Sequence, residues 1–352
     1  MGVKRILQLV DSTSSNSFSR LTPMLTRRAV DGQAAMMSND TATTVHQLVL
    51  TYGRERAREL VSPRERKLVD IAVQVLTDER QAIGISYTGF CLTSLPHKRL
   101  PDDAAWTKKG HRVTLLAEPG RMVHRGVATL YGVPYGARAR MILLYLQTQA
   151  IRTRSHEVEL GRSMAAWMAK MGITWGGETA RALREQAARI SACSLKFFWE
   201  GTDADGWTAS RIVGSGLRFH AREDGEQASL WEERVVLDST FYRALQDHPV
   251  PLQETAIREL RDRSLSLDLY VWLAWRLHEL GDATPISWPA LGTQFGAGFK
   301  ELRHFRPRFI EALAAALAAY PEARVGVGES GIILHPSRPP IARLTLRSLP
   351  RA

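Results

Sequence analysis

Two groups of basic side chains are spaced so that a helix would present each group on one surface. In residues 175–190, Arg181 and Arg184 project away from an apolar face formed by Leu183, Ala187 and Ile190. Arginine binds phosphate bidentately and reads guanine edges in DNA. The segment is therefore either an ordinary surface helix with a solvated back or a helix that reads a nucleic acid.

A second group begins at residue 300. Lys300, His304 and Arg308 are spaced i, i+4, i+8, and Arg303 and Arg306 flank them. A run of charges is usually a solvated face, but this run is nearly single-signed and is the second of its kind in the chain. These observations favour contact with DNA. Pro307 must either kink this helix or start it. The apolar face opposite the charges comprises Leu302, Phe305, Phe309, Leu313 and Ala316.

Further basic residues lie close to the two predicted helices in the sequence. Arg152 and Arg154 follow the preceding helix and could clamp phosphate. The tail 338–352 is basic and is either a phosphate-binding arm or a disordered end. The predicted DNA-binding set is Arg152, Arg154, Arg181, Arg184, Arg189, Lys196, Lys300, Arg303, His304, Arg306 and Arg308.

Signatures of enzymes are weak. The stretch 326–331, GVGESG, matches the glycine pattern of dinucleotide-binding loops, but no acidic residue follows Glu329. We interpret it as the turn of a hairpin. The chain has no Walker-type phosphate loop, no HExxH motif and no closely paired histidines of the kind that nicking enzymes use. We therefore expect no catalytic residues, no metal site and no cofactor.

Composition sets the class of protein and its partner. The chain has 352 residues, 44% of them apolar, and a net charge of +11, and most of its 47 basic residues are arginine. This is typical of a soluble globular protein that binds nucleic acid. Only two cysteines are present and no apolar run could span a membrane. We expect a cytoplasmic protein, associated with the nucleoid or a plasmid, with double-stranded DNA as partner and no membrane contact.

The order of predicted elements is helix, short strand, helix, turn, helix and β-hairpin, and it occurs twice. This order is that of a winged helix, in which a helix-turn-helix is completed by a β wing. We predict an α+β, mainly α fold of two tandem winged-helix domains. The predicted divisions are a poorly structured N-terminal segment 1–62, a first domain 63–236, a second domain 237–337 and a basic flexible tail 338–352.

Several separate motifs together resemble the RepA-type plasmid replication initiators. The resemblance covers roughly residues 65–341 and leaves the first 60 residues unaccounted for. Met171-Gly172 stands where the family usually has Leu-Gly, which is a minor departure. The motifs are SLPHKRLPDDAAW, LLAEPG, Gly132-Val133-Pro134-Tyr135-Gly136, Thr148-Gln149-Ala150-Ile151-Arg152, Leu160-Gly161-Arg162-Ser163, Gly176-Gly177, REQAARI at 184–190, the stretch SWPALGTQFGAGFKELRHF, and GIILHPSRPPI.

The resemblance implies a function that charge and spacing do not give. Such proteins bind tandem repeats called iterons at a plasmid origin, help to open adjacent AT-rich DNA and recruit host initiator and helicase-loading proteins. They commonly repress their own gene as dimers, so the resemblance also implies a homodimer. The alternatives are a winged-helix transcriptional repressor without initiator activity and, from a different class, a nicking relaxase.

Overall fold

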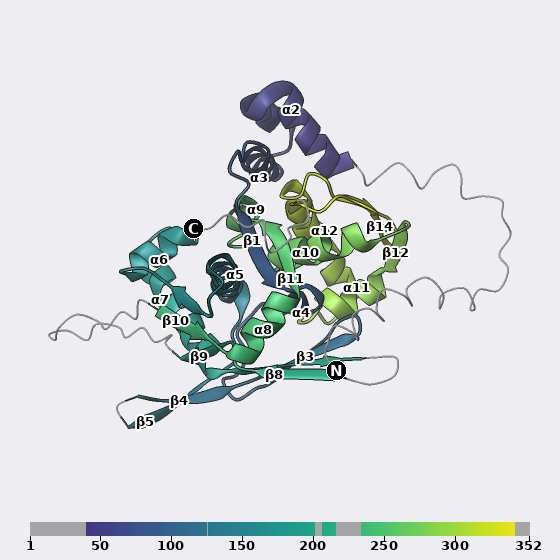
Figure 1. Cartoon of the computed structure of the whole chain (residues 1–352). Coiled ribbons are helices and arrows are strands. Elements are labelled where there is room, and N and C mark those ends of the chain that lie inside the picture. The colour runs from purple at the N-terminus through teal and green to yellow at the C-terminus, as the bar shows by residue number, and fades with distance from the viewer. Residues whose placement is uncertain (1–39, 125, 201–205, 216–233, 342–352) are drawn as a thin grey trace, which may run out of the picture.

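The structure is a computed structural model that describes residues 40–124, 126–200, 206–215 and 234–341 (Figure 1). Helices and small antiparallel sheets alternate along the chain, so the α+β, mainly α prediction is confirmed. The elements up to residue 199 are α2 (Asp40–Leu60), α3 (Arg66–Leu76), β1 (Ile83–Tyr87), α4 (Thr88–Leu92), β2 (Trp106–Lys109), β3 (Val113–Glu118), β4 (Gly120–His124), β5 (Val127–Tyr131), α5 (Gly136–Thr153), β6 (Glu157–Glu159), α6 (Met164–Lys170), α7 (Gly177–Ala192) and β7 (Ser194–Trp199). The remaining elements are β8 (Gly206–Ser210), β9 (Val213–Ser215), β10 (Arg234–Leu237), α8 (Ser239–Asp247), β11 (Pro249–Gln253), α9 (Glu254–Glu259), α10 (Ser264–Arg276), η1 (Leu277–Glu279), β12 (Thr284–Ser287), α11 (Trp288–Phe295), α12 (Leu302–Ala318), β13 (Arg324–Val327) and β14 (Gly331–His335).

Two parts of the chain share one order of elements and one sheet topology. The first unit runs α5, β6, α6, α7, β9 and β10, and its three strands are ordered β6-β10-β9. The second unit runs α10, β12, α11, α12, β13 and β14, and its strands are ordered β12-β14-β13. In both units the last strand lies in the middle of the sheet and pairs antiparallel with the other two.

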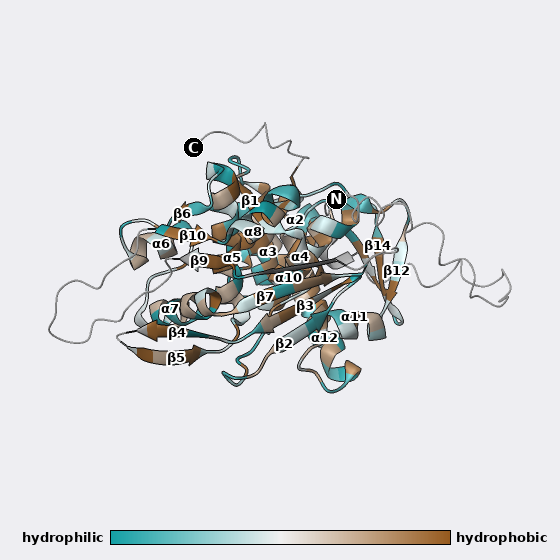
Figure 2. Cartoon of the chain, turned by 60° about the horizontal axis from the view of Figure 1, so that its bottom comes forward, coloured by the Kyte–Doolittle hydropathy of each residue, from teal (hydrophilic) through white to brown (hydrophobic). Residues whose placement is uncertain are grey.

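A four-stranded sheet, ordered β2-β3-β7-β8, lies beside the first unit. Residues 194–199 form β7, which directly follows α7 and pairs with β3 and β8. Strand β3 lies some 80 positions earlier in the chain, with Leu195 opposite Ala117. In Figure 2 the strands β2, β3 and β7 lie between α7 and the α11–α12 pair.

A second pairing links distant parts of the chain. Strand β1 pairs antiparallel with β11, with Ile85 opposite Pro251. Helix α8 also packs against α5. Residues 239–253, which the sequence assigned to the second domain, therefore lie against elements of the first. The β4–β5 hairpin packs its base on α7 and projects from the lower left of the molecule in Figure 1.

The N-terminal segment contains a helix that the sequence did not predict. Residues 40–60 form α2, whereas the segment 1–62 was expected to have little structure; residues 1–39 lie outside the described residues. The composition of α2 gives little helical signal, and tertiary contacts hold the helix in place. Val45 and Ala57 are buried, and the ring of His46 hydrogen-bonds to the Ala318 carbonyl at the end of α12 at 3.0 Å.

Candidate nucleic-acid interface

Helices α6 and α7 follow one another in the first unit and are joined by a short turn. Ser163 caps the start of α6, with its Oγ accepting a hydrogen bond from the Ala166 amide at 3.2 Å. Trp167 and Met168 are fully buried and form the core face of α6. Gly172 ends the helix with φ of 68°, a left-handed conformation that suits glycine, and the chain turns into α7.

Helix α7 has the two faces that its sequence predicted. Leu183, Ala187 and Ile190 have no exposed surface. On the opposite side, Arg181 is exposed and Arg184 is half-buried. Neither guanidinium has a hydrogen bond or ion pair with any described residue, so both remain available to an outside ligand.

Arg189 lies on the same helix but points into the protein, and its predicted role as a DNA contact is corrected. Its side chain is 4% exposed and binds Asp102 at 2.6 Å and Glu185 at 3.0 Å. It also donates to the Val133 carbonyl at 3.3 Å and stacks on the Tyr135 ring. The hydrogen bond from Arg189 holds the pKa of Asp102 below its usual range, although partial burial opposes the shift. Arg189 thus fastens α7 to the loop before α5.

Three other predicted residues of the first unit are placed less favourably for DNA. Arg152 pairs with Glu254 at the start of α9 and donates to the Ile83 carbonyl at 3.1 Å. Lys196 lies in β7 and pairs with Glu118 at 2.6 Å, away from the strands β9 and β10. Arg154 is exposed and ends α5 in a left-handed conformation. Their contact with DNA stays a prediction.

Helix α12 follows α11 in the second unit after a short turn. It begins at Leu302, and Pro307 lies inside its second turn rather than at its start. Phe305, Phe309 and Leu313 are buried as predicted. Leu302 was predicted on the same apolar face but is 43% exposed, because it lies beyond the edge of the core at the first position of the helix.

The cations of α12 differ in what holds them. Arg303 pairs with Glu301 at 2.6 Å and Arg308 pairs with Glu311 at 3.2 Å. Arg306 lies over the Trp288 ring at 4.9 Å and donates to the Gly328 carbonyl at 3.3 Å. Gly328 belongs to the β13–β14 turn, which is the hairpin predicted from GVGESG.

Two further cations of this region are exposed and unengaged. Lys300 and His304 have no hydrogen bond or ion pair with any residue that the structure describes. Among the predicted DNA-binding residues, those without a hydrogen bond or ion pair to the described part of the chain are therefore Arg181 and Arg184 in the first unit and these two in the second.

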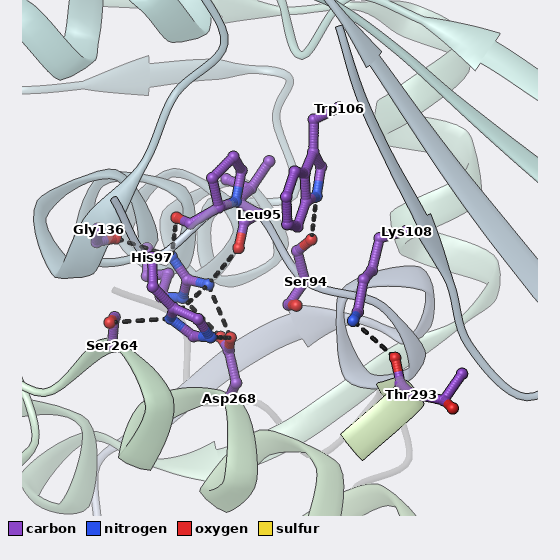
Figure 3. Close-up of polar contacts among 11 residues, drawn as sticks. Ser94, Leu95, His97, Trp106, Lys108, Gly136, Ser264, Asp268 and Thr293 are labelled. Atoms are coloured by element: carbon purple, nitrogen blue, oxygen red, sulfur yellow. Dashed lines mark hydrogen bonds and ion pairs between the residues drawn. The ribbon is translucent and has the colours of Figure 1, made fainter. Parts of the chain in front are cut away.

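A buried polar cluster joins the two units (Figure 3). Arg140 of α5 makes a bidentate ion pair with Asp268 of α10, at 2.6 and 2.7 Å, and both side chains are buried. The same guanidinium donates to the carbonyls of Leu95, Pro96 and Gly136. We call the side chains of His97, Arg140, Ser264 and Asp268 the junction cluster.

Burial sets the charge states around the junction cluster. It lowers the pKa of His97 to about 4, aided by the neighbouring Arg140 guanidinium and opposed by Asp268. His97 is therefore neutral near pH 7, so its 3.8 Å approach to Asp268 is not an ion pair there. Its Nδ1 lies 3.0 Å from the Ser264 hydroxyl.

Lys108 extends this connection to α11 of the second unit. It lies on β2 of the four-stranded sheet and donates to the Thr293 carbonyl of α11 at 2.9 Å (Figure 3). Burial lowers the pKa of Lys108 to about 8, opposed by Asp268. The junction cluster therefore links α5 to α10, and Lys108 links the four-stranded sheet to α11.

Sequence reasoning missed this junction, although its residues lie in motifs that had been noticed. His97 and Asp102 belong to the stretch SLPHKRLPDDAAW, and Gly136 ends the turn before α5. The amide of Gly136 donates to the Pro96 carbonyl at 2.9 Å, so the two motifs pack on each other. These two family-like motifs lie far from both basic helices in the sequence, and they were the signal that could have indicated a second important site.

Comparison with known proteins identifies the segment that contains the first unit. Residues 133–289 match the protein-family model described as RepA_C, plasmid encoded RepA protein. The matched segment is similar to this family and spans a little under half of the chain. The RepA match begins in the turn before α5 and ends within α11, so α12 lies outside it.

Two solved structures are also similar to the chain. They are crystal structures of domains 2 and 3 of RctB, each with 14% sequence identity. The first covers 65% of this chain and 83% of that chain with a TM-score of 0.43, and the second covers 64% and 80% with a TM-score of 0.40. Among curated proteins no match is found.

Neither a membrane span nor a metal cluster is found in the described ranges. No helix there combines the length and apolar character needed to cross a bilayer. No group of three or more His, Cys, Asp or Glu side chains in that part of the chain is arranged to hold a metal ion. Both cysteines, Cys91 and Cys193, are buried and free.

Proposed function

We propose that this chain is a plasmid replication initiator whose two units are winged helices, with α7 and α12 as the helices that enter DNA. The observation that carries the proposal is the repeated topology, in which a helix-turn-helix is followed by a hairpin whose last strand lies mid-sheet. Each reading helix has unengaged cations at its exposed side, Arg181 and Arg184 in one and Lys300 and His304 beside the other. The RepA match over residues 133–289 supports the role in plasmid replication.

The buried junction between the two units leads to a prediction about the spacing of the DNA half-sites. Because the junction cluster and Lys108 connect the units through buried contacts, the two reading helices approach DNA at one fixed separation. Helices held in this way bind successive major grooves about 34–36 Å apart. We propose that each repeat at the origin contains two half-sites about one helical turn apart.

The further steps belong to the same proposal. After binding the repeats in the cytoplasm, the protein promotes opening of adjacent AT-rich DNA and recruits host initiator and helicase-loading proteins. It represses its own gene as a homodimer. We propose that it carries out no catalytic reaction and that all of these steps proceed by binding.

The test is binding of the full chain to the DNA that flanks its gene. Nuclease footprinting should reveal protected repeats with half-sites about one turn apart. Arg184→Ala should weaken binding to these repeats by about 5- to 160-fold, since a bidentate base contact is worth about 1–3 kcal/mol, and should weaken binding to random DNA much less. Arg66→Ala, which removes an exposed arginine from α3, is the matched control and should change neither affinity.

Two outcomes would count against this assignment. An equal loss of specific and random binding in Arg184→Ala would reduce Arg184 to a phosphate contact. If no repeat is protected, the proposed function itself is refuted. Footprinting does not separate an initiator from a repressor of the same fold, which requires a replication assay.

A further inference from the structure

The start of α12 and the turn before it expose two apolar side chains. Leu302 is 43% exposed and Phe299, in the turn just before it, is 36% exposed. Both lie on the surface that the proposed function turns toward DNA, in the same short stretch of chain as the exposed cations Lys300 and His304. An apolar surface with cations close by is suited to bind an apolar group of DNA, because the cations can contact the phosphates next to that group.

The hollow between α11 and α12 is shaped by glycine. It has a volume of about 310 Å³ and is lined in part by Pro289, Gly292, Phe299 and Leu302. A Cβ atom on Gly292 would come within 2.7 Å of Leu302 Cδ2, so the glycine lets the leucine lie flat against α11. Phe299 is fixed in turn by an edge contact with the buried Phe305 ring, with centroids 5.7 Å apart. The hollow therefore has a preformed wall, in which the apolar side chains of Phe299 and Leu302 lie beside the polar residues Thr293, Lys300 and Glu301.

The arginines of α12 are less free to read bases than those of α7. Arg306 is held by the Trp288 ring and the Gly328 carbonyl, and Arg303 is neutralised by Glu301. Arg308 pairs with Glu311 one turn further along the helix. In α7, by contrast, Arg181 and Arg184 have no partner in the described part of the chain. The two helices thus offer different chemistry to a DNA groove.

The major groove presents one apolar group, the C5-methyl of thymine. We infer that Leu302, with Phe299 beside it, contacts thymine methyl groups in one half-site, whereas α7 reads polar base edges in the other. This inference rests on the proposed function and adds the base class that the second unit selects. Lys300 and His304 would hold the phosphates on either side of the contacted thymine.

The test replaces thymines by deoxyuridine, which lacks only the methyl group. Wild-type full-length protein is titrated against the footprinted repeat and against duplexes in which one thymine at a time is replaced. One or two replacements in a single half-site should weaken binding about fourfold, the factor for one buried methyl group. Leu302→Ala should weaken binding to the thymine duplex and abolish the difference at those positions, whereas Leu302→Met should retain it.

Leu50→Ala provides the matched control, because Leu50 is an exposed leucine on α2, a helix that bonds to α12 at Ala318, the opposite end of α12 from Leu302. It should leave every deoxyuridine effect unchanged. If no replacement weakens wild-type binding, the inference is overturned while DNA binding stands. If the effect persists in Leu302→Ala, the methyl contact belongs to another residue and the assignment is overturned. If the wild-type protein binds no repeat, the proposed function fails instead.

Discussion

The Arg140–Asp268 ion pair gives the sharpest prediction about how the two units are joined. Asp268→Asn keeps the shape of the side chain but removes its charge and turns one acceptor oxygen into an amide donor that faces Arg140. The guanidinium keeps its three backbone carbonyls but becomes an uncompensated charge in a buried site, since its side chain is 7% exposed. Breaking a buried pair in this way costs about 3–5 kcal/mol.

That loss is a large fraction of the ~5–15 kcal/mol by which a domain is stable. It is measured by urea unfolding, followed by both tryptophan fluorescence and circular dichroism. With a slope of roughly 3 kcal/mol/M, the midpoint should fall by about 1–1.7 M urea. The matched control is Asp262→Asn, because Asp262 pairs with Arg138 of the same helix at 2.7 Å but is 60% exposed. An exposed pair of this kind contributes about 0–1 kcal/mol, so this variant should change the midpoint little.

A double variant separates the ion pair from the packing around it. Replacing Arg140 by Met and Asp268 by Leu removes both charges and fills the site with apolar side chains, so it should recover part of the lost stability, although the carbonyls of Leu95, Pro96 and Gly136 lose the donor that Arg140 supplied. The reasoning is refuted if Asp268→Asn is no more destabilising than Asp262→Asn. It is also refuted if the apolar double variant is as unstable as the single one.

Two further predictions concern acid stability and the C-terminal tail. The pKa of His97 falls from an ordinary value of 6.5 to about 4 in the folded protein, so the unfolded chain takes up a proton first as the pH falls from about 6.5 to 4. The neutral His97 therefore contributes stability that is present above pH 6.5 and is lost over this window, up to about 3 kcal/mol at ~1.4 kcal/mol per pH unit. His97→Gln should flatten this part of a curve of unfolding free energy against pH. An unchanged slope would contradict the assignment. Deleting residues 338–352, of which only 338–341 are described, should reduce the salt dependence of DNA binding because the tail is basic, and an unchanged slope would show that it does not touch DNA.

Local elements were predictable because they carry local signals. Ser163 as an N-cap, the buried Trp167 and Met168, and the apolar face of α7 all follow from helical spacing and capping chemistry. The order of helices and strands in both units was predicted by the same means. The winged-helix architecture itself stays a proposal.

Long-range pairing was not predictable from those signals. The β1–β11 pair joins strands more than 160 positions apart, and the sequence of neither strand indicates which strand it pairs with. Arg189 resembles an exposed helix charge until Asp102, 87 residues earlier in the chain, is seen against it. Leu302 is the opposite case. Helical spacing predicts that it is buried on the core face, but it is 43% exposed because the core does not extend to the first position of α12.

The most direct test of the account is replication of a plasmid that depends on this gene. A plasmid with no other origin is built to carry the gene and its flanking DNA, and a second copy differs only by a frameshift in the gene. In a third strain, the intact gene is expressed from another location in the cell, so that the protein is present together with the frameshifted plasmid. We predict that the intact plasmid is maintained, that the frameshifted plasmid is lost, and that the supplied protein rescues it. Loss of the intact plasmid, in cells where the protein is made and protects its repeats, would contradict the initiator function and leave a repressor.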